Sequence, residues 1–354
     1  LIQDYGLTQE EAAHRVSKSR PAVANAMRLL SLPQEVQWLI EQGNLSAGHG
    51  RALLSLPAPE EQIQFAGEIM EKGYSVRETE PDLDEIRAQR GGKGLIGPGV
   101  IEICRAADIA FLALHGAEGE NGKLQACLDL YGVPYTGSGY LGSALAMDKE
   151  LSKILFRSSG IPTPPGVTLR RGDAVPESIG FPCVVKPCSG GSSVGTSIVT
   201  EPEKLPGALE EAFSCDEAVL VEKYIRAREL TVGVMDGRAM AVIEIIPKTG
   251  FYDYKNKYQA GLTEEICPAP ISAEDTERVQ RLAERVYEAL HLDAYGRVDF
   301  LMDKADGELY CLEANTLPGM TPTSLIPQMA AAEGMDYGEL CEKIIEVSLK
   351  KYKK

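Results

Sequence analysis

The sequence predicts a mixed α/β (α+β) protein whose first part is entirely helical. Residues 1–80 contain repeated helix-start signals and almost no alternation of β-branched residues. After residue 80, strand-type apolar segments alternate with amphipathic segments, and closely spaced strand pairs follow. A chain of 354 residues is long enough for about two or three domains.

The composition is that of an ordinary globular protein, with 44% apolar and 25% charged residues. The net charge of −16 argues against a surface that is basic throughout and coats nucleic acid or anionic lipid, although a local basic patch is not excluded. No segment reaches the roughly 18 apolar residues of a membrane span, and no signal segment opens the chain. We therefore expect a cytoplasmic protein without a membrane partner.

The eight cysteines are scattered without CxxC spacing, and most lie in apolar segments. Reduced, buried thiols are therefore expected, and disulfides or a zinc site are not. The chain begins with Leu1 instead of Met, which leads us to expect a fragment, a processed product or an engineered join.

Helix-start residues divide the first 80 positions into short helices. Capping or proline residues open four of them, at Thr8, Ser19, Pro33 and Ser46. The second of these helices is expected to run to Leu30. A fifth helix is predicted from Pro59 to Lys72, because Gly73 follows it.

The first two helices have the spacing of a helix-turn-helix, with a tight turn at residues 16–18. Residues 14–28 carry four basic side chains and no acid, which is the local charge that a phosphate backbone requires. A plain helical bundle with a solvated basic face is the alternative, and charge alone favours it.

The sequence motifs in residues 1–80 favour DNA binding. The segments LTQEEAAHRVSKSRPAVANAMRLLSLP, GNLSAGHGRALL and YSVRETE resemble the central DNA-binding region of ParB/Noc partition proteins. The resemblance implies DNA contacts from Lys18, Ser19, Arg20, Asn25 and Arg28. It does not include that family's nucleotide-binding and dimerisation parts, so loading and spreading on DNA are not implied.

After residue 80 the expected elements alternate between strands and helices. A strand at 109–114, a helix from about Gly122 to Leu130, a strand at 133–137 and a helix from Ser143 to Ser158 come first. Two strand pairs follow, PCVVKP (182–187) with TSIVT (196–200) and GRVDFLMD (296–303) with ELYCLEAN (308–315).

Two glycine-rich segments are candidates for phosphate binding. The first, Gly137 to Gly142, has a formal G-x-G-x-x-G pattern, but no acid ends a second strand about 20 residues later, so we interpret it as a tight turn. The second, Ser189 to Gly195, follows Lys186 and links two strands. Small residues let backbone N–H groups converge on one anion, which suits a triphosphate. A flexible hairpin loop is the alternative, and Lys149 and Lys186 weigh against it.

The last strand pair carries an oxygen-rich cluster beside a cation. A three-residue loop at 305–307, with Gly307 in the left-handed conformation, would pair position 304 with 308. Arg297 would then lie opposite Asn315, and Asp299 opposite Glu313, all on one face. Two carboxylates and an amide suit magnesium. A surface charge cluster is the alternative, but the neighbouring residues are strongly apolar.

These motifs resemble those of the D-alanine–D-alanine ligases, ATP-grasp enzymes of peptidoglycan synthesis. The resemblance rests on HGAEGENG, SGYLGSALAMDKELSK, GIPTPPG, VVKPCSGGSSVGTS, VLVEKYI, FYDYKNKY, CPAP, GRVDF and LEANTLPGMTPTSL, and it covers residues 81–354. It implies an ATP-grasp fold after the helix-turn-helix segment of residues 1–80. The expected parts are a remnant of the N-terminal α/β domain (81–144), a central subdomain (145–226) and a C-terminal catalytic subdomain (227–354).

The resemblance also implies an ATP site and a metal site. In the ATP site, Lys149 and Lys186 would bind the α/β phosphates, and the loop around Ser192 would cover them. The adenine edge would be bound by Glu222 and by the backbone of Lys223 and Ile225. Glu229 would bind the ribose, and Lys257 would contact the transferred phosphoryl group. Two Mg²⁺ ions, for which Mn²⁺ can substitute, would be held by Asp299, Glu313 and Asn315.

The implied reaction joins two D-alanine molecules through an acyl phosphate. Arg297 and the backbone N–H of Gly319 would stabilise the oxyanion, and Ser324 and Leu325 would bind the carboxylate of the second substrate. Tyr258 would close a mobile loop and favour a D-alanine acceptor. His115 would lie near the charged groups of the substrate; without the HGAEGENG motif around it, a satisfied core histidine would be the better interpretation. A homodimer is a further hypothesis.

The sequence departs from the ligase pattern at its start. The family opens with a strand, a glycine-rich turn and an acidic residue that binds the ammonium of the first D-alanine, and residues 1–80 show no such unit. Glu118 and Glu120 have motif positions that indicate structural roles in their loop. We therefore expect a ligase that is truncated and impaired; a partial ParB-like DNA-binding protein with an inactive ligase fragment, or a non-functional join of two gene fragments, are the alternatives.

Overall fold

The computed structural model describes residues 15, 20–54, 56, 59–72, 96–97, 99–114, 116–190, 194–247, 263–321 and 323–353. The chain forms two compact units, Leu1–Gly97 and Pro98–Lys354. The domain boundary predicted at residues 80 and 81 lies outside the described residues.

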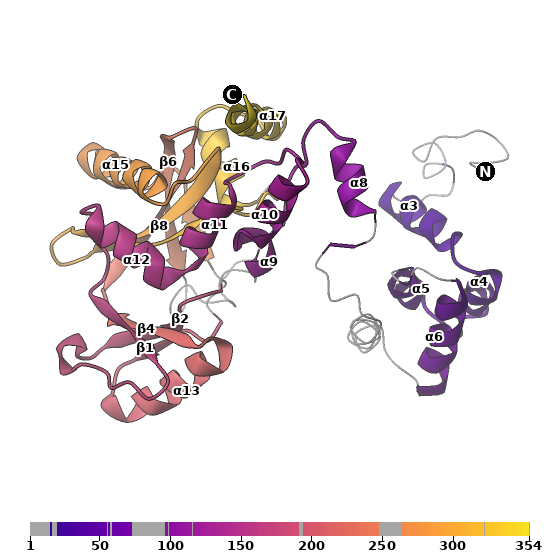
Figure 1. The fold of residues 1–354 in the computed structure, drawn as a ribbon, viewed down its shortest axis with the longest axis horizontal. Helices are drawn as coiled ribbons and strands as arrows, with labels where there is room; N and C mark the ends of the chain where they lie inside the picture. The colour runs from indigo at the N-terminus through magenta and orange to yellow at the C-terminus, as the bar shows by residue number, and fades with distance from the viewer. Residues whose placement is uncertain are drawn as a thin grey trace. The chain divides into compact units, whose positions relative to one another are not determined.

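The first unit is a group of short helices, shown in indigo in Figure 1. They are α3 (Arg20–Leu29), α4 (Gln34–Glu41), α5 (Ala47–Leu53) and α6 (Pro59–Lys72). Their buried faces form one apolar cluster that includes Leu32, Val36, Leu53 and Phe65. Amphipathic helices this short are stable mainly through such packing.

The predicted helix starts of the first unit agree with the structure where it is described. Ser46 caps α5 reciprocally with His49, since each side chain accepts a hydrogen bond from the other's backbone N–H at 3.2 Å. Pro33 occupies the N-cap of α4, one position before the helix begins. The bounds of α6 are those predicted. The helix predicted from Thr8 lies outside the described residues.

The beginning of the second unit contains helices but less strand than the sequence predicts. After α8 (Val100–Arg105), the segments 109–114 and 133–137 meet only in an isolated parallel bridge between Ala110 and Tyr135. The prediction of two full strands was therefore wrong. A strand requires a repeated ladder, and the backbone bonds here are those of Ala110 with Pro134 and Thr136. Between these segments lie α9 (Ala117–Glu120) and α10 (Lys123–Leu130), the latter close to its predicted bounds.

The helix predicted from Ser143 to Ser158 is divided into two. They are α11 (Tyr140–Met147) and α12 (Lys149–Ser158), and Asp148 between them has extended backbone. The Asp148 carboxylate accepts a hydrogen bond from the Leu151 N–H at 3.0 Å, as an N-cap does. The Lys149 N–H donates to the carbonyl of Cys188, outside the helix, at 2.9 Å. The break places Lys149 at the start of a new helix.

A four-stranded antiparallel sheet with the order β1-β4-β2-β3 follows. Its strands are β1 (Gly166–Arg170), β2 (Cys183–Pro187), β3 (Ser197–Val199) and β4 (Ala218–Lys223). The predicted pairing of 182–187 with 196–200 is confirmed, with Val184 opposite Ile198. Helix α13 (Leu205–Cys215) packs its Ala208 and Ala212 against this sheet. Short 3₁₀ turns occur at Glu177–Ile179 and Pro202–Lys204.

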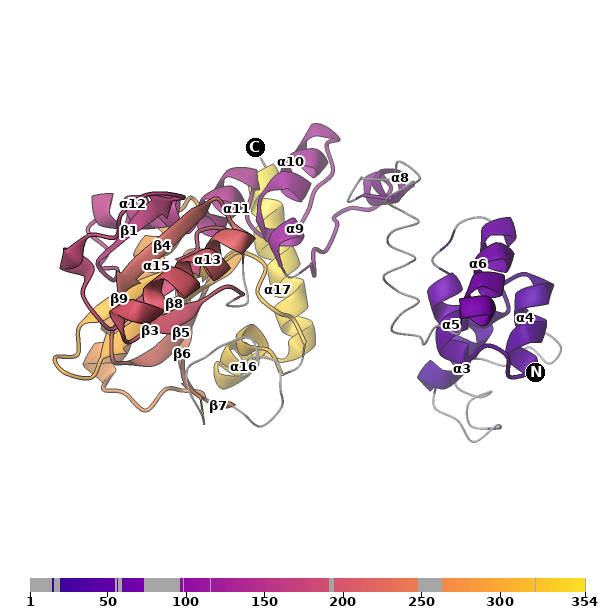
Figure 2. The same ribbon diagram turned by 90° about the horizontal axis from the view of Figure 1, so that it is seen from below.

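A five-stranded antiparallel sheet with the order β7-β6-β5-β8-β9 completes the second unit. The strands are β5 (Ala227–Met235), β6 (Arg238–Pro247), β7 (Thr263–Ile266), β8 (Tyr295–Asp303) and β9 (Leu309–Asn315). Helix α15 (Ala273–Ala289) covers one face, and α16 (Leu325–Ala332) with α17 (Tyr337–Leu349) covers the other (Figures 1 and 2). A final turn, Lys350–Tyr352, follows α17.

The β8–β9 hairpin has the predicted pairs at its far end but a different loop. Arg297 lies opposite Asn315 and Asp299 opposite Glu313, as predicted. Asp303, not residue 304, pairs with Glu308, through a backbone bond of 2.8 Å, so the prediction of a three-residue loop was wrong. A β-bulge beyond Asp299 places Phe300 opposite Cys311 and restores the register. Gly307 has φ of 74° in the loop, as its left-handed position requires.

Candidate active site

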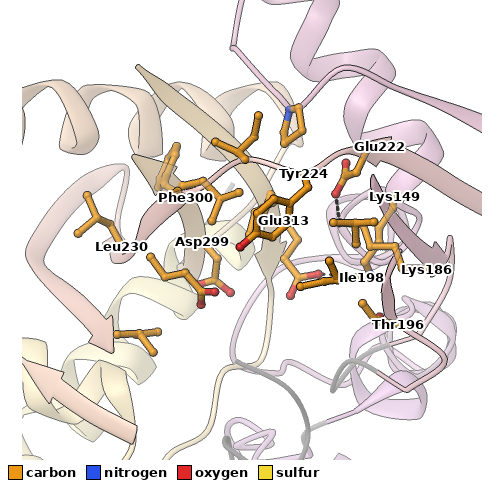
Figure 3. A pocket seen from close by; sticks show the side chains of 18 of the residues that line it. Lys149, Lys186, Thr196, Ile198, Glu222, Tyr224, Leu230, Asp299, Phe300 and Glu313 are labelled. Atoms are coloured by element: carbon orange, nitrogen blue, oxygen red, sulfur yellow. Dashed lines mark ion pairs between the residues drawn. The ribbon is translucent and has the colours of Figure 1, made fainter. Parts of the chain in front are cut away.

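A cavity of 680 Å³ lies between the two sheets of the second unit (Figure 3). Its walls come from β2 and β4 on one side and from β5, β6, β8 and β9 on the other. Many of the residues that the sequence predicts for ATP and metal binding line it: Lys149, Lys186, Glu222, Lys223, Ile225, Glu229, Asp299 and Glu313. The fold therefore brings residues from separate elements to one cavity of nucleotide size.

The two lysines of the predicted phosphate site are largely buried, with 11% of each side chain exposed. The Lys149 ammonium donates to the Gly190 carbonyl at 2.9 Å and lies 3.4 Å from a Glu313 carboxylate oxygen. Lys186 pairs with Glu222. Gly190 belongs to the glycine-rich loop, so Lys149 joins that loop to the acidic end of β9. Figure 3 shows these lysines on one side of the cavity and Asp299 on the other.

Glu222 is buried between two lysines. One carboxylate oxygen pairs with Lys186, and the other lies 2.8 Å from the ammonium of Lys153. Burial alone would raise the pKa of Glu222, but Lys153 and Lys186 outweigh it and lower the pKa to about 2. Burial lowers the pKa of Lys153 and opposes the rise that Glu222 causes in the pKa of Lys186. Glu222 is therefore an ionised carboxylate shared by two cations.

Lys153 is a residue that the sequence reasoning missed. It lies four positions after Lys149 on α12, so both side chains share one helix face. That spacing was the available signal. Its ammonium also donates to Thr163 Oγ1 at 2.6 Å, and Thr163 donates to the Cys311 carbonyl at 2.9 Å.

Asp299 is held by three donors, one from its own strand and two from neighbouring strands. Arg297 donates to both carboxylate oxygens at 2.9 Å, in a bidentate pair. Asn315 donates to one oxygen at 3.0 Å, and Thr231 donates to the other at 2.6 Å. Thr231 was also missed, because it comes from β5, which pairs with β8 far away in the sequence. These contacts fix the carboxylate at the cavity wall.

The donor set around Asp299 suits a hard cation. Two carboxylates, those of Asp299 and Glu313, lie at opposed positions of a hairpin beside the amide of Asn315, and magnesium prefers such oxygen ligands. Among the described residues, no three His, Cys, Asp or Glu side chains cluster as possible metal ligands. The proposed set is thus two carboxylates with an amide.

The residues predicted to bind the second substrate lie in the loop before α16 and at the start of that helix. Ser324 precedes α16, and its hydroxyl accepts a hydrogen bond from the Thr321 N–H at 3.0 Å. A Cβ at Gly319 would come within 2.9 Å of that hydroxyl, so a larger residue there would have to displace the Ser324 side chain. Leu325 is buried at the first turn of the helix. These residues form a compact loop, separate from the lining of the cavity.

The remaining predicted site residues are described only in part. His115, Ser192, Lys257 and Tyr258 lie outside the described residues, as do Lys18 and Ser19 of the helix-turn-helix. Arg20 and Asn25 belong to α3, and Arg28 is exposed in its last turn.

Glu120 has the structural role predicted from its motif position. Its carboxylate accepts hydrogen bonds from the N–H of Gly116 at 2.9 Å and of Leu317 at 3.2 Å. It therefore joins the HGAEGENG loop to the segment after β9. None of the described helices has both the length and the apolarity needed to cross a membrane.

A cavity between two antiparallel sheets, lined by buried lysines and opposed carboxylates, defines the ATP-grasp class of carboxylate–amine ligases. The family model "D-ala D-ala ligase C-terminus" matches residues 155–346, which is more than half of the chain. The chain belongs to the D-alanine–D-alanine ligase family.

Individual relatives agree with this assignment. The D-alanine–D-alanine ligase of Pediococcus pentosaceus is 46% identical over 270 residues, which cover 75% of this chain and 76% of that protein. The ligase of Geobacter sulfurreducens is 49% identical over 242 residues, or 67% and 76% of the two chains. The crystal structure of the Bacillus anthracis ligase complexed with ATP is 38% identical with a TM-score of 0.64, covering 72% of this chain and 84% of that one.

The first unit is similar to a different family. The family model "ParB HTH domain" matches residues 1–88, so the predicted resemblance of residues 1–80 to ParB-type proteins is confirmed. The chain therefore joins a segment similar to the ParB helix-turn-helix domain to a part that belongs to the D-alanine–D-alanine ligase family.

Proposed function

We propose that the second unit binds Mg-ATP in the cavity between its sheets and uses it to join two D-alanine molecules for peptidoglycan synthesis. One observation carries this proposal: Lys149, Lys186, Asp299 and Glu313 come from separate elements and meet at one cavity. Phosphoryl transfer depends mainly on positioning and charge neutralisation, which this set of side chains provides without a protein nucleophile.

The nucleotide is proposed to lie along the cavity with its phosphates at the lysines. Lys149 and Lys186 would hold the α/β phosphates, the loop around Ser192 would cover them, and Lys257 would contact the transferred group. Because the Glu222 carboxylate is already shared by two lysines, we assign the adenine edge mainly to the backbone of Lys223 and Ile225. Glu229, which also lines the cavity, would bind the ribose hydroxyls.

Asp299, Glu313 and Asn315 are proposed to hold two Mg²⁺ ions, for which Mn²⁺ can substitute. When bound, the ions neutralise charge on the nucleotide phosphates. Arg297 and Thr231 keep the Asp299 carboxylate in place through the contacts described above. Lys149 holds Glu313 beside the glycine-rich loop.

The proposed reaction proceeds in two steps. The carboxylate of the first D-alanine attacks the γ-phosphate of ATP, forming an acyl phosphate and releasing ADP; the amine of the second D-alanine then attacks the acyl carbon and displaces phosphate. Arg297 and the Gly319 N–H would stabilise the oxyanion of the second step. Ser324 and Leu325 would bind the carboxylate of the second substrate. His115 would lie near the charged groups of the substrate, and Tyr258 would close its loop over the site.

The Mg-ATP site can be tested by isothermal titration of the full chain with and without Mg²⁺. We expect magnesium-dependent binding, which Lys186→Ala or Glu313→Ala weakens by about 2 to 3 kcal/mol, because each substitution removes a charged and partly buried contact. Lys204→Ala is the matched control, since Lys204 is exposed and pairs with Glu201. Unchanged affinity in both cavity variants would refute the assignment of the site.

A second function, DNA binding by the first unit, is favoured by the family match of residues 1–88. The recognition residues would be Lys18, Ser19, Arg20, Asn25 and Arg28. The exposed side chain of Arg28 at the end of α3 is compatible with a contact to a phosphate backbone.

A further inference from the structure

Three charged side chains meet at the wall of the cavity of the second unit. Lys153 extends from α12, Glu222 from β4 and Lys186 from β2. The exposed fractions of their side chains are 1%, 2% and 11%, respectively. One carboxylate therefore serves two ammonium groups in a site that is almost closed to water.

The two lysines have different access to a ligand. Lys186 and Glu222 line the cavity, whereas Lys153 lies behind Glu222 and is anchored by the hydroxyl of Thr163 at 2.6 Å. Thr163 is in turn fixed by the carbonyl of Cys311 at 2.9 Å. Lys153 thus acts on the cavity through Glu222 and not by touching the nucleotide.

The charges of this cluster determine what Lys186 can offer to a phosphate. One carboxylate shared by two ammonium groups leaves one net positive charge, and Lys186 is the member at the cavity. Without Lys153, Glu222 would neutralise Lys186 completely and hold its ammonium against β4. A low-dielectric surrounding makes such charge sharing stronger than it would be in water.

We propose that Lys153 is a positioning residue for ATP binding, which draws part of the Glu222 charge to itself and so leaves the Lys186 ammonium positive and available to the nucleotide phosphates. This inference rests on the proposed function. A buried ion pair can also be purely structural. The two possibilities predict opposite results when Glu222 is neutralised.

The test measures Mg-ATP affinity of the full chain by isothermal titration. Lys153→Met removes the charge with little change in length, and we expect affinity to fall about tenfold, as for the loss of a charge-assisted contact. Adding Glu222→Gln to Lys153→Met should return affinity to within about threefold of the unsubstituted chain, because Lys186 is then no longer neutralised. Arg157→Met is the matched control, since Arg157 is an exposed cation of the same helix.

Lys153→Arg keeps the positive charge and is a variant that does not depend on the folding of Lys153→Met. The inference predicts that this variant binds ATP nearly as tightly as the unsubstituted chain, with folding checked by circular dichroism. Binding as weak in Lys153→Arg as in Lys153→Met, no rescue in the double variant, or unchanged affinity in Lys153→Met would overturn the inference. If the unsubstituted chain binds no ATP, the proposed function fails as well; if Lys186→Ala weakens binding and Lys153→Met does not, the inference fails alone.

Discussion

The two units of the chain place their charged side chains differently. In the first unit, the described core is made by residues such as Val36, Leu53 and Phe65, and Arg28 is exposed. In the second unit, Lys153 and Glu222 are buried as deeply as the apolar core. The first unit can thus present charge at its surface, whereas the second holds charge inside its fold.

This difference corresponds to the chemistry expected of each unit. A DNA backbone is a long polyanion, and solvated cations on a helix surface are sufficient to bind it. Phosphoryl transfer instead needs charges that are already oriented before the substrate arrives, in a site from which water is excluded. Two sheets with a cavity between them can supply that environment, and short helices packed through one small core cannot.

The largest effect, on the rate of dipeptide formation, is expected when residues 1–80 are exchanged. We predict that the chain forms D-alanyl-D-alanine poorly, because a buried substrate ammonium without a carboxylate partner loses roughly several kcal/mol. A family-type N-terminal strand and turn, grafted in place of residues 1–80, should raise dipeptide formation by about 10² or more, since it restores the position of the first substrate. Phosphate release with and without D-alanine, and chromatography for the dipeptide, measure this.

Two outcomes would alter the comparison of the units. A graft that fails to restore the dipeptide would locate the defect in residues 81–354. Turnover of the unsubstituted chain at about 1 s⁻¹ or faster would show that a residue in 1–80 supplies the missing carboxylate, and the first unit would then have a catalytic role.

An intermediate effect, on the pH dependence of folding stability, is expected from the buried Glu222 carboxylate of the second unit. The folded-state pKa of Glu222, about 2, lies below its usual value of 4.5, so its ionised form stabilises the fold above pH 4.5. This stabilisation, about 3 kcal/mol, should be lost as the pH falls from 4.5 toward 2. Urea unfolding followed by circular dichroism at several pH values measures it, with Glu222→Gln as the reference lacking this titration.

The single tryptophan makes this prediction specific to one unit. Trp38 lies in α4 of the first unit, so its fluorescence reports unfolding there. The prediction would be contradicted if Glu222→Gln and the unsubstituted chain lost the same stability between pH 4.5 and 2. The fluorescence transition of Trp38, which reports on the first unit, provides an internal control.

The smallest effect is expected at the surface of the first unit. With few cationic contacts, DNA binding should be weak and strongly salt-dependent, and an affinity near roughly 10⁻⁸ M is not expected. Arg20→Ala should reduce the slope of log affinity against log salt by about one. Gel shifts across a salt series measure both. Nanomolar binding at physiological salt would contradict the prediction, and an unchanged slope would place the contact elsewhere.

The β8–β9 hairpin shows how local reasoning can predict the correct residue pairs from an incorrect loop. The predicted loop was one residue too short, and this error alone would have shifted every pair along the hairpin. The β-bulge beyond Asp299 compensates for it, so Asp299 still faces Glu313. Turn signals in the sequence identified the hairpin, but the bulge depends on how β9 packs.

The helix break at Asp148 is a second case. Amphipathic periodicity continues across residues 143–158 and predicts one helix, because periodicity alone does not detect a change of direction. The N-cap bond of Asp148 and the bond from Lys149 to the Cys188 carbonyl stabilise the break. The acceptor of the second bond is Cys188, which follows β2 far along the chain, so this bond could not be inferred locally.

The sequence by itself determined the helical start, the resemblance to two families and the residue types proposed for the nucleotide site, because capping, periodicity and contiguous motifs are local properties. Tertiary structure decided which of those residues meet. Thr231 reaches Asp299 only because β5 pairs with β8, and Lys153 reaches Glu222 only because the fold brings α12 and β4 close to each other. Contacts between distant segments depend on the packing of the entire unit, and no local pattern in the sequence encodes them.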